Sequence, residues 1–175
     1  MLTGDNARTA LAAGITTVRD LGGRGRVALD LRAECAADPV AGPTLLVSGA
    51  PLTTRGGHCW FLGGEVEGPE AIRAAAAYQI DEGVDVVKVM ATGGNVTPGS
   101  APYESQFTVE MLRAVTELAH AAGVPVAAHA HGVDGVRDSV AAGVDTIEHG
   151  TFMTSDGVAD DPALVDRLAA TGLPV

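Results

Sequence analysis

The sequence predicts an α/β fold of alternating strands and helices, because three features recur along the chain. Predicted helices end in Ala-Ala-Gly or a similar phrase, a short apolar run follows each of these glycines, and polar residues close several of the runs. Glycine just past a helix readily adopts the positive φ that ends helices. Apolar runs are typical of strands covered on both faces. The alternation predicts a parallel sheet with right-handed crossovers. The expected strands are 15–20, 44–48, 84–90, 124–129, 144–149 and 173–175.

The first half of the chain contains three predicted helices. One covers about 5–13, before the first strand, and a second covers 27–37. A third begins at Pro69, since proline is favoured in the first turn of a helix. The apolar face expected for the second helix consists of Val27, Leu31 and Cys35.

The second half repeats this pattern. Thr108 is the expected N-cap of a helix over 108–122, because its hydroxyl can accept a hydrogen bond from a free N–H group. Pro162 is expected in the first turn of the last helix. The apolar stripe expected for the helix over 108–122 consists of Met111, Val115, Leu118, Ala119 and Ala122.

Loop lengths favour a (β/α)₈ barrel over an open doubly wound sheet. Loops entering the strands are short, whereas two loops leaving them, 49–68 and 91–107, are long and lie where barrel enzymes place their chemistry. No G-x-G-x-x-G follows the first strand. A barrel needs eight strands, and this chain opens with a helix and stops within a predicted strand. We therefore expect one domain over 1–175, a partial barrel of roughly strands 2 to 7 that lacks the first and last strands. An open six-stranded sheet is the alternative.

Composition argues against several classes of partner. Eleven basic and 22 acidic residues give a net charge of −11, which disfavours nucleic acid and anionic membranes. The sequence contains no apolar run of membrane-spanning length and no signal-peptide layout at its N-terminus. The two cysteines do not form a disulfide framework. The expectation is a soluble cytoplasmic protein.

Lys88 is the only lysine in the chain, and it lies at the end of an apolar strand. A buried ammonium group is costly unless its pKa falls or the amine is chemically converted. Two chemistries require an amine at such a position: a Schiff base with a carbonyl substrate, or a carbamate that binds metal. A lysine whose charged end reaches solvent at the rim is the structural alternative.

Histidines close the two strands that follow the strand of Lys88. His129 and His149 end these strands, and adjacent parallel strands bring their carboxyl ends together. Imidazoles with a carbamate oxygen suit Zn²⁺, and three protein ligands with one open position are typical of catalytic sites. His131 has the same strand parity as His129, so parity does not decide which of the two binds metal. His58 lies in a glycine-rich loop that is a candidate binding loop.

The chain resembles the metal-dependent amidohydrolase superfamily, in the branch of imidazolonepropionase-like proteins and Xaa-Pro dipeptidases. The similarity is carried in order by AGITTVRDLGG, TTRGGHCWFLGGE, VDVVKVMATGG, ESQFTVEMLRAV, VPVAAHAHG and AAGVDTIEHGTFM. The resemblance implies a (β/α)₈ barrel with one or two divalent ions, Zn²⁺ by expectation. It implies that carboxylated Lys88, His129 and His149 are metal ligands, and that His58 and His131 contact the substrate.

The resemblance further implies hydrolysis of an amide bond by metal-activated water. The implied substrates are dipeptides, N-acyl amino acids or cyclic amides. Two elements of the family pattern have no counterpart here: an H-x-H pair, expected before Met1, and a general-base Asp, expected after Val175. No catalytic base is therefore expected within this chain, and the isolated chain is expected to be inactive.

Two alternative functions remain open from the sequence. A Schiff-base lyase would use Lys88 as its nucleophile, but it leaves His129 and His149 without a role. A non-catalytic truncated barrel would expose sheet edges and associate with partners, including other copies of itself.

Overall fold

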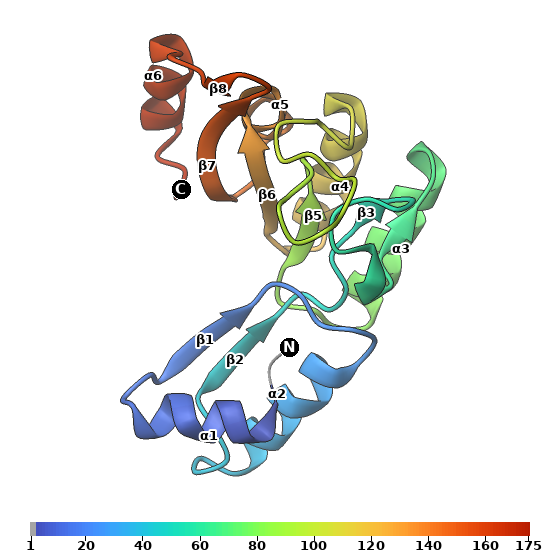
Figure 1. Ribbon diagram of the computed structural model, residues 1–175. Helices are drawn as coiled ribbons and strands as arrows, with labels where there is room; N and C mark the ends of the chain where they lie inside the picture. The colour runs from blue at the N-terminus through green and yellow to red at the C-terminus, as the bar shows by residue number, and fades with distance from the viewer. Residues whose placement is uncertain (1–2) are drawn as a thin grey trace.

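The computed structural model describes residues 3–175 and shows alternating strands and helices (Figure 1). The helices are α1 (Gly4–Ala12), α2 (Val27–Ala37), α3 (Pro69–Asp81), α4 (Val109–Ala121), α5 (Val133–Ala142) and α6 (Pro162–Thr171), with one 3₁₀ turn, η1 (Trp60–Leu62). The strands are β1 (Thr17–Asp20), β2 (Thr44–Val47), β3 (Thr53–Thr54), β4 (Glu65–Val66), β5 (Val87–Met90), β6 (Val126–Gly132), β7 (Thr146–Thr154) and β8 (Gly157–Val158).

The main parallel strands lie beside one another in the order of the chain. β1 pairs with β2, and β5, β6 and β7 pair in turn, all in parallel. Two contacts join these groups: the Asp85 N–H donates to the Val47 carbonyl at 2.9 Å, and Leu52 forms a parallel bridge with Val89. Among the strands of residues 3–175, only the short β8, after the end of β7, runs antiparallel. The order is never reversed among these main strands, unlike the strand order of a doubly wound sheet.

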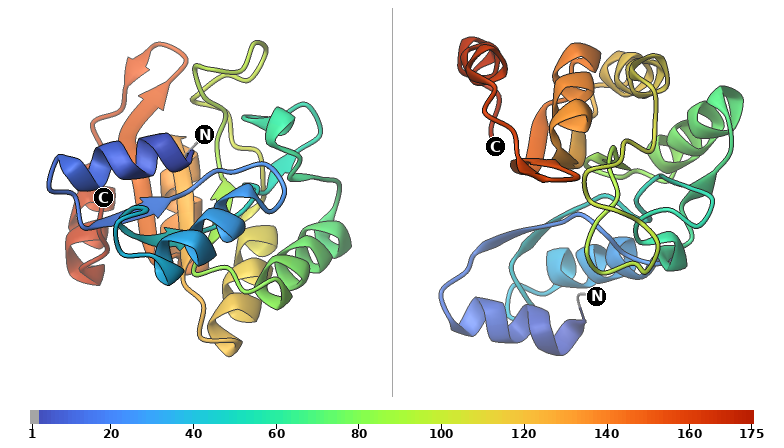
Figure 2. Two further views of the ribbon diagram at one scale, coloured as in Figure 1. Left: turned by 90° about the horizontal axis from the view of Figure 1, so that it is seen from below. Right: turned by 45° about the horizontal axis from the view of Figure 1, so that its top comes forward.

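The helices cover one face of the β5–β7 sheet, so the opposite face is left for the site. α3 packs against α4 and α4 against α5 (Figure 2). Val87 and Val89 of β5 belong to the hydrophobic core, together with Ile147 of β7. Because side chains alternate along a strand, Lys88 projects from the face opposite Val87 and Val89. Lys88 pairs with Ala127 of β6, and His129 lies two residues further along that strand, so Lys88 and His129 project from the same face.

Glycines end the helices as predicted. Gly14, Gly83, Gly123, Gly143 and Gly172 all have positive φ, between 65° and 85°. A side chain at these positions would strain the backbone, which is why the same residue recurs before five of the six expected strands. The first-turn prolines are also confirmed, since α3 and α6 both begin with one.

The Thr108 hydroxyl accepts a hydrogen bond from the Met111 N–H and caps α4, as predicted. We expect Thr108→Ala to lower the free energy of unfolding by about 1 kcal/mol, because that N–H loses its acceptor. Urea titration would measure the change. Thr108→Ser keeps the hydroxyl and is expected to lose much less. Equal losses in the two variants would contradict the capping role.

Two details of the predicted helix faces are wrong. Val27 begins α2 and is 43% exposed, so the buried face is formed by Ala28, Leu31 and Cys35 at the spacing of one helical stripe. In α4 the buried residues include Leu112 and Thr116, whereas Ala122 lies past the helix end and is exposed. Both errors arise because the sequence pattern does not determine the rotation of a helix against its neighbours.

The strand boundaries also differ from expectation. β6 continues to Gly132 and β7 to Thr154, so the site histidines lie within these strands rather than at their last residues. Residues 173–175 are not a strand, although the Pro174 carbonyl accepts from the Ile147 N–H at 3.0 Å. The long loop over 49–68 contains β3, η1 and β4, which the sequence did not predict.

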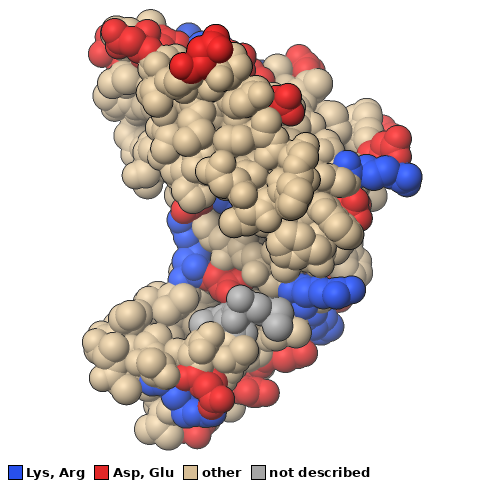
Figure 3. Space-filling view, in the orientation of Figure 1, with Lys and Arg blue, Asp and Glu red and all other residues tan. Residues whose placement is uncertain are grey.

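No helix in residues 3–175 combines the length and apolarity needed to cross a bilayer. Figure 3 shows acidic side chains gathered at the upper end of one face. It also shows a hollow between the β1–β2 unit and the larger sheet, where charges of both signs meet.

Candidate metal centre

The site is built on two adjacent strands. His129 and His131 are two residues apart on β6, so their side chains project from the same face. His129 is buried and His131 is partly buried. Their ring centroids lie 4.8 Å apart, with the rings nearly perpendicular.

His149 reaches the same face through an irregularity in β7. It is paired with Ala130, and strict alternation would place it on the helix-covered face with Ile147. Instead His149 adopts a φ of 84°, Gly150 follows with a φ of 55°, and the register with β6 shifts just beyond. The bulge redirects the His149 ring to 4.7 Å from that of His129. Left-handed backbone at a non-glycine residue is strained, and such strain is concentrated at functional sites.

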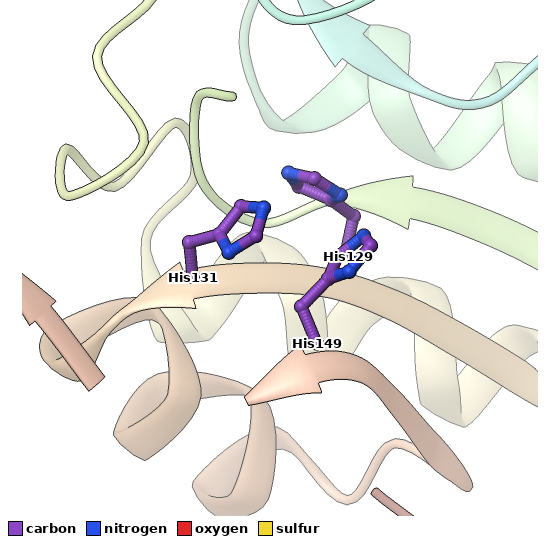
Figure 4. Close-up of side chains that lie close together, drawn as sticks. All are labelled: His129, His131 and His149. Atoms are coloured by element: carbon purple, nitrogen blue, oxygen red, sulfur yellow. The ribbon is translucent and has the colours of Figure 1, made fainter. Parts of the chain in front are cut away.

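The three histidines converge on a common point (Figure 4). One ligand nitrogen from each of His129, His131 and His149 lies within 4.8 Å of the others. The rings of His131 and His149 are stacked 4.4 Å apart. Three imidazole nitrogens at this separation form a donor set suited to Zn²⁺ and similar ions.

His58 joins this group from the loop before η1. Its ring stacks on His129 at 4.5 Å, and its side chain is 5% exposed. Its Nδ1 is buried without a hydrogen-bond partner. We call His58, His129, His131 and His149 the histidine cluster.

Gln106 holds the His58 loop in place. Its Oε1 accepts from the His58 N–H at 2.6 Å, and its Nε2 donates to the Met90 carbonyl at 2.7 Å. One amide therefore ties the loop to the end of β5. Gly94 lies beneath the His58 ring, where a Cβ would come within 2.4–2.7 Å of three ring atoms. The close stacking of the loop thus requires glycine at position 94.

In His129 and His131, one ring nitrogen donates a hydrogen bond and the other keeps a free lone pair. The His129 Nε2 lies 2.9 Å from the Gly93 carbonyl, which can only accept, so Nε2 carries the proton and Nδ1 is unprotonated. The Thr151 hydroxyl donates to the His131 carbonyl at 3.4 Å, and so accepts from His131 Nδ1 at 2.8 Å. That arrangement leaves His131 Nε2 unprotonated. A hydrogen bond to the second ring nitrogen is the usual way in which proteins orient metal-binding imidazoles.

Burial keeps the histidine cluster neutral. It lowers the pKa of His129 to about 3, despite the opposing hydrogen bond to Gly93. Burial also lowers the pKa values of His58, His131 and His149. The positive charges that neighbouring histidines and Lys88 carry when protonated add to these shifts: those of His131, His149 and Lys88 for His58, that of His149 for His131, and that of Lys88 for His149. Neutral imidazole is the form that binds metal, so the rings meet this requirement without an opposing proton at neutral pH.

Lys88 is 3% exposed, and burial lowers its pKa to about 7, with Glu148 partly opposing the shift. Lys88 pairs with Ala127, two residues before His129 on β6, so the two side chains share a face of the sheet. The charge of Lys88 in turn lowers the pKa values of His58, His129 and His149. Within residues 3–175, no carboxylate lies within 4.0 Å of the Lys88 amine. Glu148 is paired with Arg19 at 2.7 Å instead.

Comparison with known families identifies the family of this chain. The model of the amidohydrolase family matches residues 4–171. The chain belongs to the amidohydrolase family.

One relative in the comparison is ochratoxinase of Aspergillus niger, which is 30% identical to this chain over 168 residues. The aligned region covers 82% of this chain and 34% of the ochratoxinase. A crystal structure of a Xaa-Pro dipeptidase with methionine in its active site superposes with a TM-score of 0.85 at 33% identity, covering 97% of this chain and 44% of that one. The structure of A. niger ochratoxinase gives a TM-score of 0.82 at 26% identity, covering 97% of this chain and 43% of that one. The chain therefore spans about a third of the curated relative and less than half of these solved structures.

Within this amidohydrolase chain, the structure brings the histidines named in the sequence analysis together. His129 and His149 converge as expected, and His58 joins them from its loop. The His131 ring lies 4.8 Å from that of His129 and 4.4 Å from that of His149, close to the 4.7 Å that separates the rings of His129 and His149. Its ring nitrogen thus belongs to the same possible donor set.

Sequence reasoning missed the groups that support the cluster. Gln106 lies within ESQFTVEMLRAV, one of the stretches that carry the family resemblance, but nothing in the sequence indicated that its side chain supports the His58 loop. The Gly93–Gly94 pair and Thr151 are visible in the sequence, next to a predicted strand and next to His149, but their roles depend on contacts between distant segments.

Proposed function

We propose that this chain is the metal-holding part of an amidohydrolase that hydrolyses an amide bond in a dipeptide, an N-acyl amino acid or a cyclic amide. Its relatives include hydrolases that act on amide bonds, a Xaa-Pro dipeptidase and ochratoxinase. The observation that carries the proposal is the convergence of the neutral imidazoles of His129 and His149, whose ligand nitrogens lie within 4.8 Å of each other, on the strands next to that of the buried Lys88. A divalent ion there, Zn²⁺ by preference, would polarise an amide carbonyl and lower the pKa of water.

We assign His129 and His149 as metal ligands, with Lys88 as the third. The Lys88 amine is neutral over much of the physiological pH range because its pKa is about 7. A neutral amine can add CO₂ and release a proton, which converts it into a carbamate anion with oxygen ligands. Its place on the same face of the sheet as His129 supports this assignment.

We assign His58 and His131 to the substrate. His58 stacks on His129 at the loop side of the cluster, and its unpartnered Nδ1 can receive or give a hydrogen bond. His131 is more accessible than His129. It can orient a polar group of the substrate through the nitrogen that Thr151 leaves free.

The proposal extends to the architecture. Parallel strands paired in chain order support one unit of residues 1–175, arranged as roughly strands 2 to 7 of a (β/α)₈ barrel. Within residues 3–175, the close-set metal-binding group contains only histidines. Hydrolysis also requires a group that accepts the proton of water, commonly a carboxylate. We therefore expect the 175-residue chain to bind metal without efficient turnover.

Metal content tests this proposal. The chain would be incubated with ZnCl₂ and bicarbonate, desalted and analysed by mass spectrometry for zinc per folded chain. We expect near-stoichiometric zinc in the wild type, loss of most of it in His129→Ala and Lys88→Ala, and retention in His131→Ala. His120→Ala is the matched control, because His120 pairs with Asp145 outside the cluster. A folded wild type without zinc, or a His129→Ala variant that retains it, would refute the proposal.

The neutral buried amine also supports a second candidate, a Schiff-base lyase. Such an enzyme would condense the Lys88 amine with a carbonyl compound and release water. Borohydride reduction in the presence of pyruvate would trap the adduct as a stable mass increase at Lys88. The hydrolase proposal predicts no such adduct, whereas efficient trapping would favour the lyase.

A further inference from the structure

A cavity lies between α2 and α3, away from the histidine cluster. It has a volume of about 350 Å³, within the range of small-molecule sites. Leu29 of α2 and Ala75 of α3 lie on its two sides, and no member of the histidine cluster lines it. Figure 1 shows these two helices on either side of the chain segment that leads from β2 to β3. The rest of its lining is mostly apolar, including Leu52, Leu62, Val66 and Val84, and it also contains four charged residues, Arg24, Arg26, Glu65 and Glu82.

One buried polar group in this wall has an unsatisfied hydrogen-bonding atom. Gln79, on α3, is 8% exposed and lines the cavity. Its Nε2 donates to the Ala50 carbonyl, and because a carbonyl can only accept, the amide orientation is determined. The other amide atom, Oε1, is buried and has no partner. Buried acceptors are nearly always paired in folded proteins, so this oxygen lacks a partner that a donor at the cavity wall could supply.

We infer that this cavity is a binding site for a small apolar molecule that carries an N–H or O–H donor. The apolar walls would hold the body of the molecule, and the donor would bond to Gln79 Oε1. An unsatisfied acceptor in an apolar pocket discriminates strongly between a ligand with the donor and the same shape without it. The site is separate from the amide-hydrolysing centre proposed above.

The cavity is nevertheless coupled by the backbone to the strand of Lys88. Leu52, in its wall, donates to the Lys88 carbonyl and accepts from the Met90 N–H, both at 2.8 Å. An occupant that contacts Leu52 therefore touches the segment paired with β5. The site can be tested by binding alone, so its failure would not bear on the metal centre.

Indole and indene are a matched pair of probes. They share a bicyclic shape, but indole has an N–H where indene has a CH₂ group. Titration of the 175-residue chain, followed by saturation-transfer NMR, would give both affinities. We expect indole to bind about tenfold more tightly than indene, the ratio expected for one neutral hydrogen bond. Equal affinities, or no binding of either probe, would overturn the inference and leave water as the partner of Oε1.

Two variants locate the site. Gln79→Met keeps the length of the side chain but removes the acceptor, so it is expected to abolish the preference for indole while indene binds as before. Ala75→Phe fills the cavity from the partly exposed side of α3 and is expected to abolish binding of both probes. Circular dichroism would confirm that each variant folds, and Ala75→Phe tests the location even if Gln79→Met does not fold. Unchanged indole binding in Ala75→Phe would place the probe elsewhere and overturn the assignment.

Discussion

The metal-free chain, prepared without bicarbonate, is expected to become more stable by about 2 kcal/mol between pH 7.5 and 9.5 because of Lys88. Burial lowers the pKa of this amine from its ordinary 10.5 to about 7. Between these two values the unfolded chain binds a proton that the folded chain has released. The free energy of unfolding therefore rises with pH, by up to about 1.4 kcal/mol per unit. Below pH 7 both states are protonated and the contribution of Lys88 is flat.

Lys88→Met isolates this contribution. Methionine has a similar length and no charge, so the variant is expected to lose the rise with pH and to exceed the wild type in stability at pH 6. Other groups also titrate in this range; burial raises the pKa values of the Cys35 and Cys59 thiols, which opposes the rise at high pH. The Cys35 contribution cancels in the difference between the two proteins, whereas that of Cys59 cancels only in part, because the Lys88 charge lowers the pKa of that thiol. Urea titrations at four pH values would measure that difference, and parallel profiles would show that the Lys88 amine is not desolvated.

Gly94→Ala is expected to lower the free energy of unfolding by about 1–3 kcal/mol, the usual cost of forcing an extra carbon into a packed site. The new Cβ would come within 2.4–2.7 Å of three atoms of the His58 ring, so the ring has to move. Gly94 is not among the glycines with positive φ, so alanine meets no backbone strain there. The effect is therefore a direct measure of the contact with His58.

A double-mutant cycle tests that contact. If the cost of Gly94→Ala comes from the His58 ring, the same substitution is expected to cost little in a His58→Ala background. The nitrogen chemical shifts of the remaining histidines would report whether the rest of the cluster is preserved. Additive losses in the double variant would assign the cost to another neighbour of Gly94.

The sequence was sufficient to predict the helices and most of the longer strands, but not the helix faces. The glycines that follow five of the helices and the prolines at helix starts act through local backbone geometry, so their positions could be predicted directly. The exposure of Val27 could not, because the rotation of α2 depends on the segments it packs against. The strands of two residues each, β3, β4 and β8, were also missed. Strands this short have no periodicity, and they form only because a partner lies beside them.

The sequence by itself determined which residues are available for chemistry. A lone lysine and histidines that follow apolar runs were visible because such runs are set by local composition, and adjacent parallel strands bring their carboxyl ends together. Only the tertiary structure decided how the residues meet. The bulge that turns His149 toward His129, the support of His58 by Gln106, and the space over Gly94 all depend on contacts between segments far apart in the chain. The physical reason is that a ligand geometry depends on distances of a few ångströms between separate strands, which packing determines and a one-dimensional pattern does not contain.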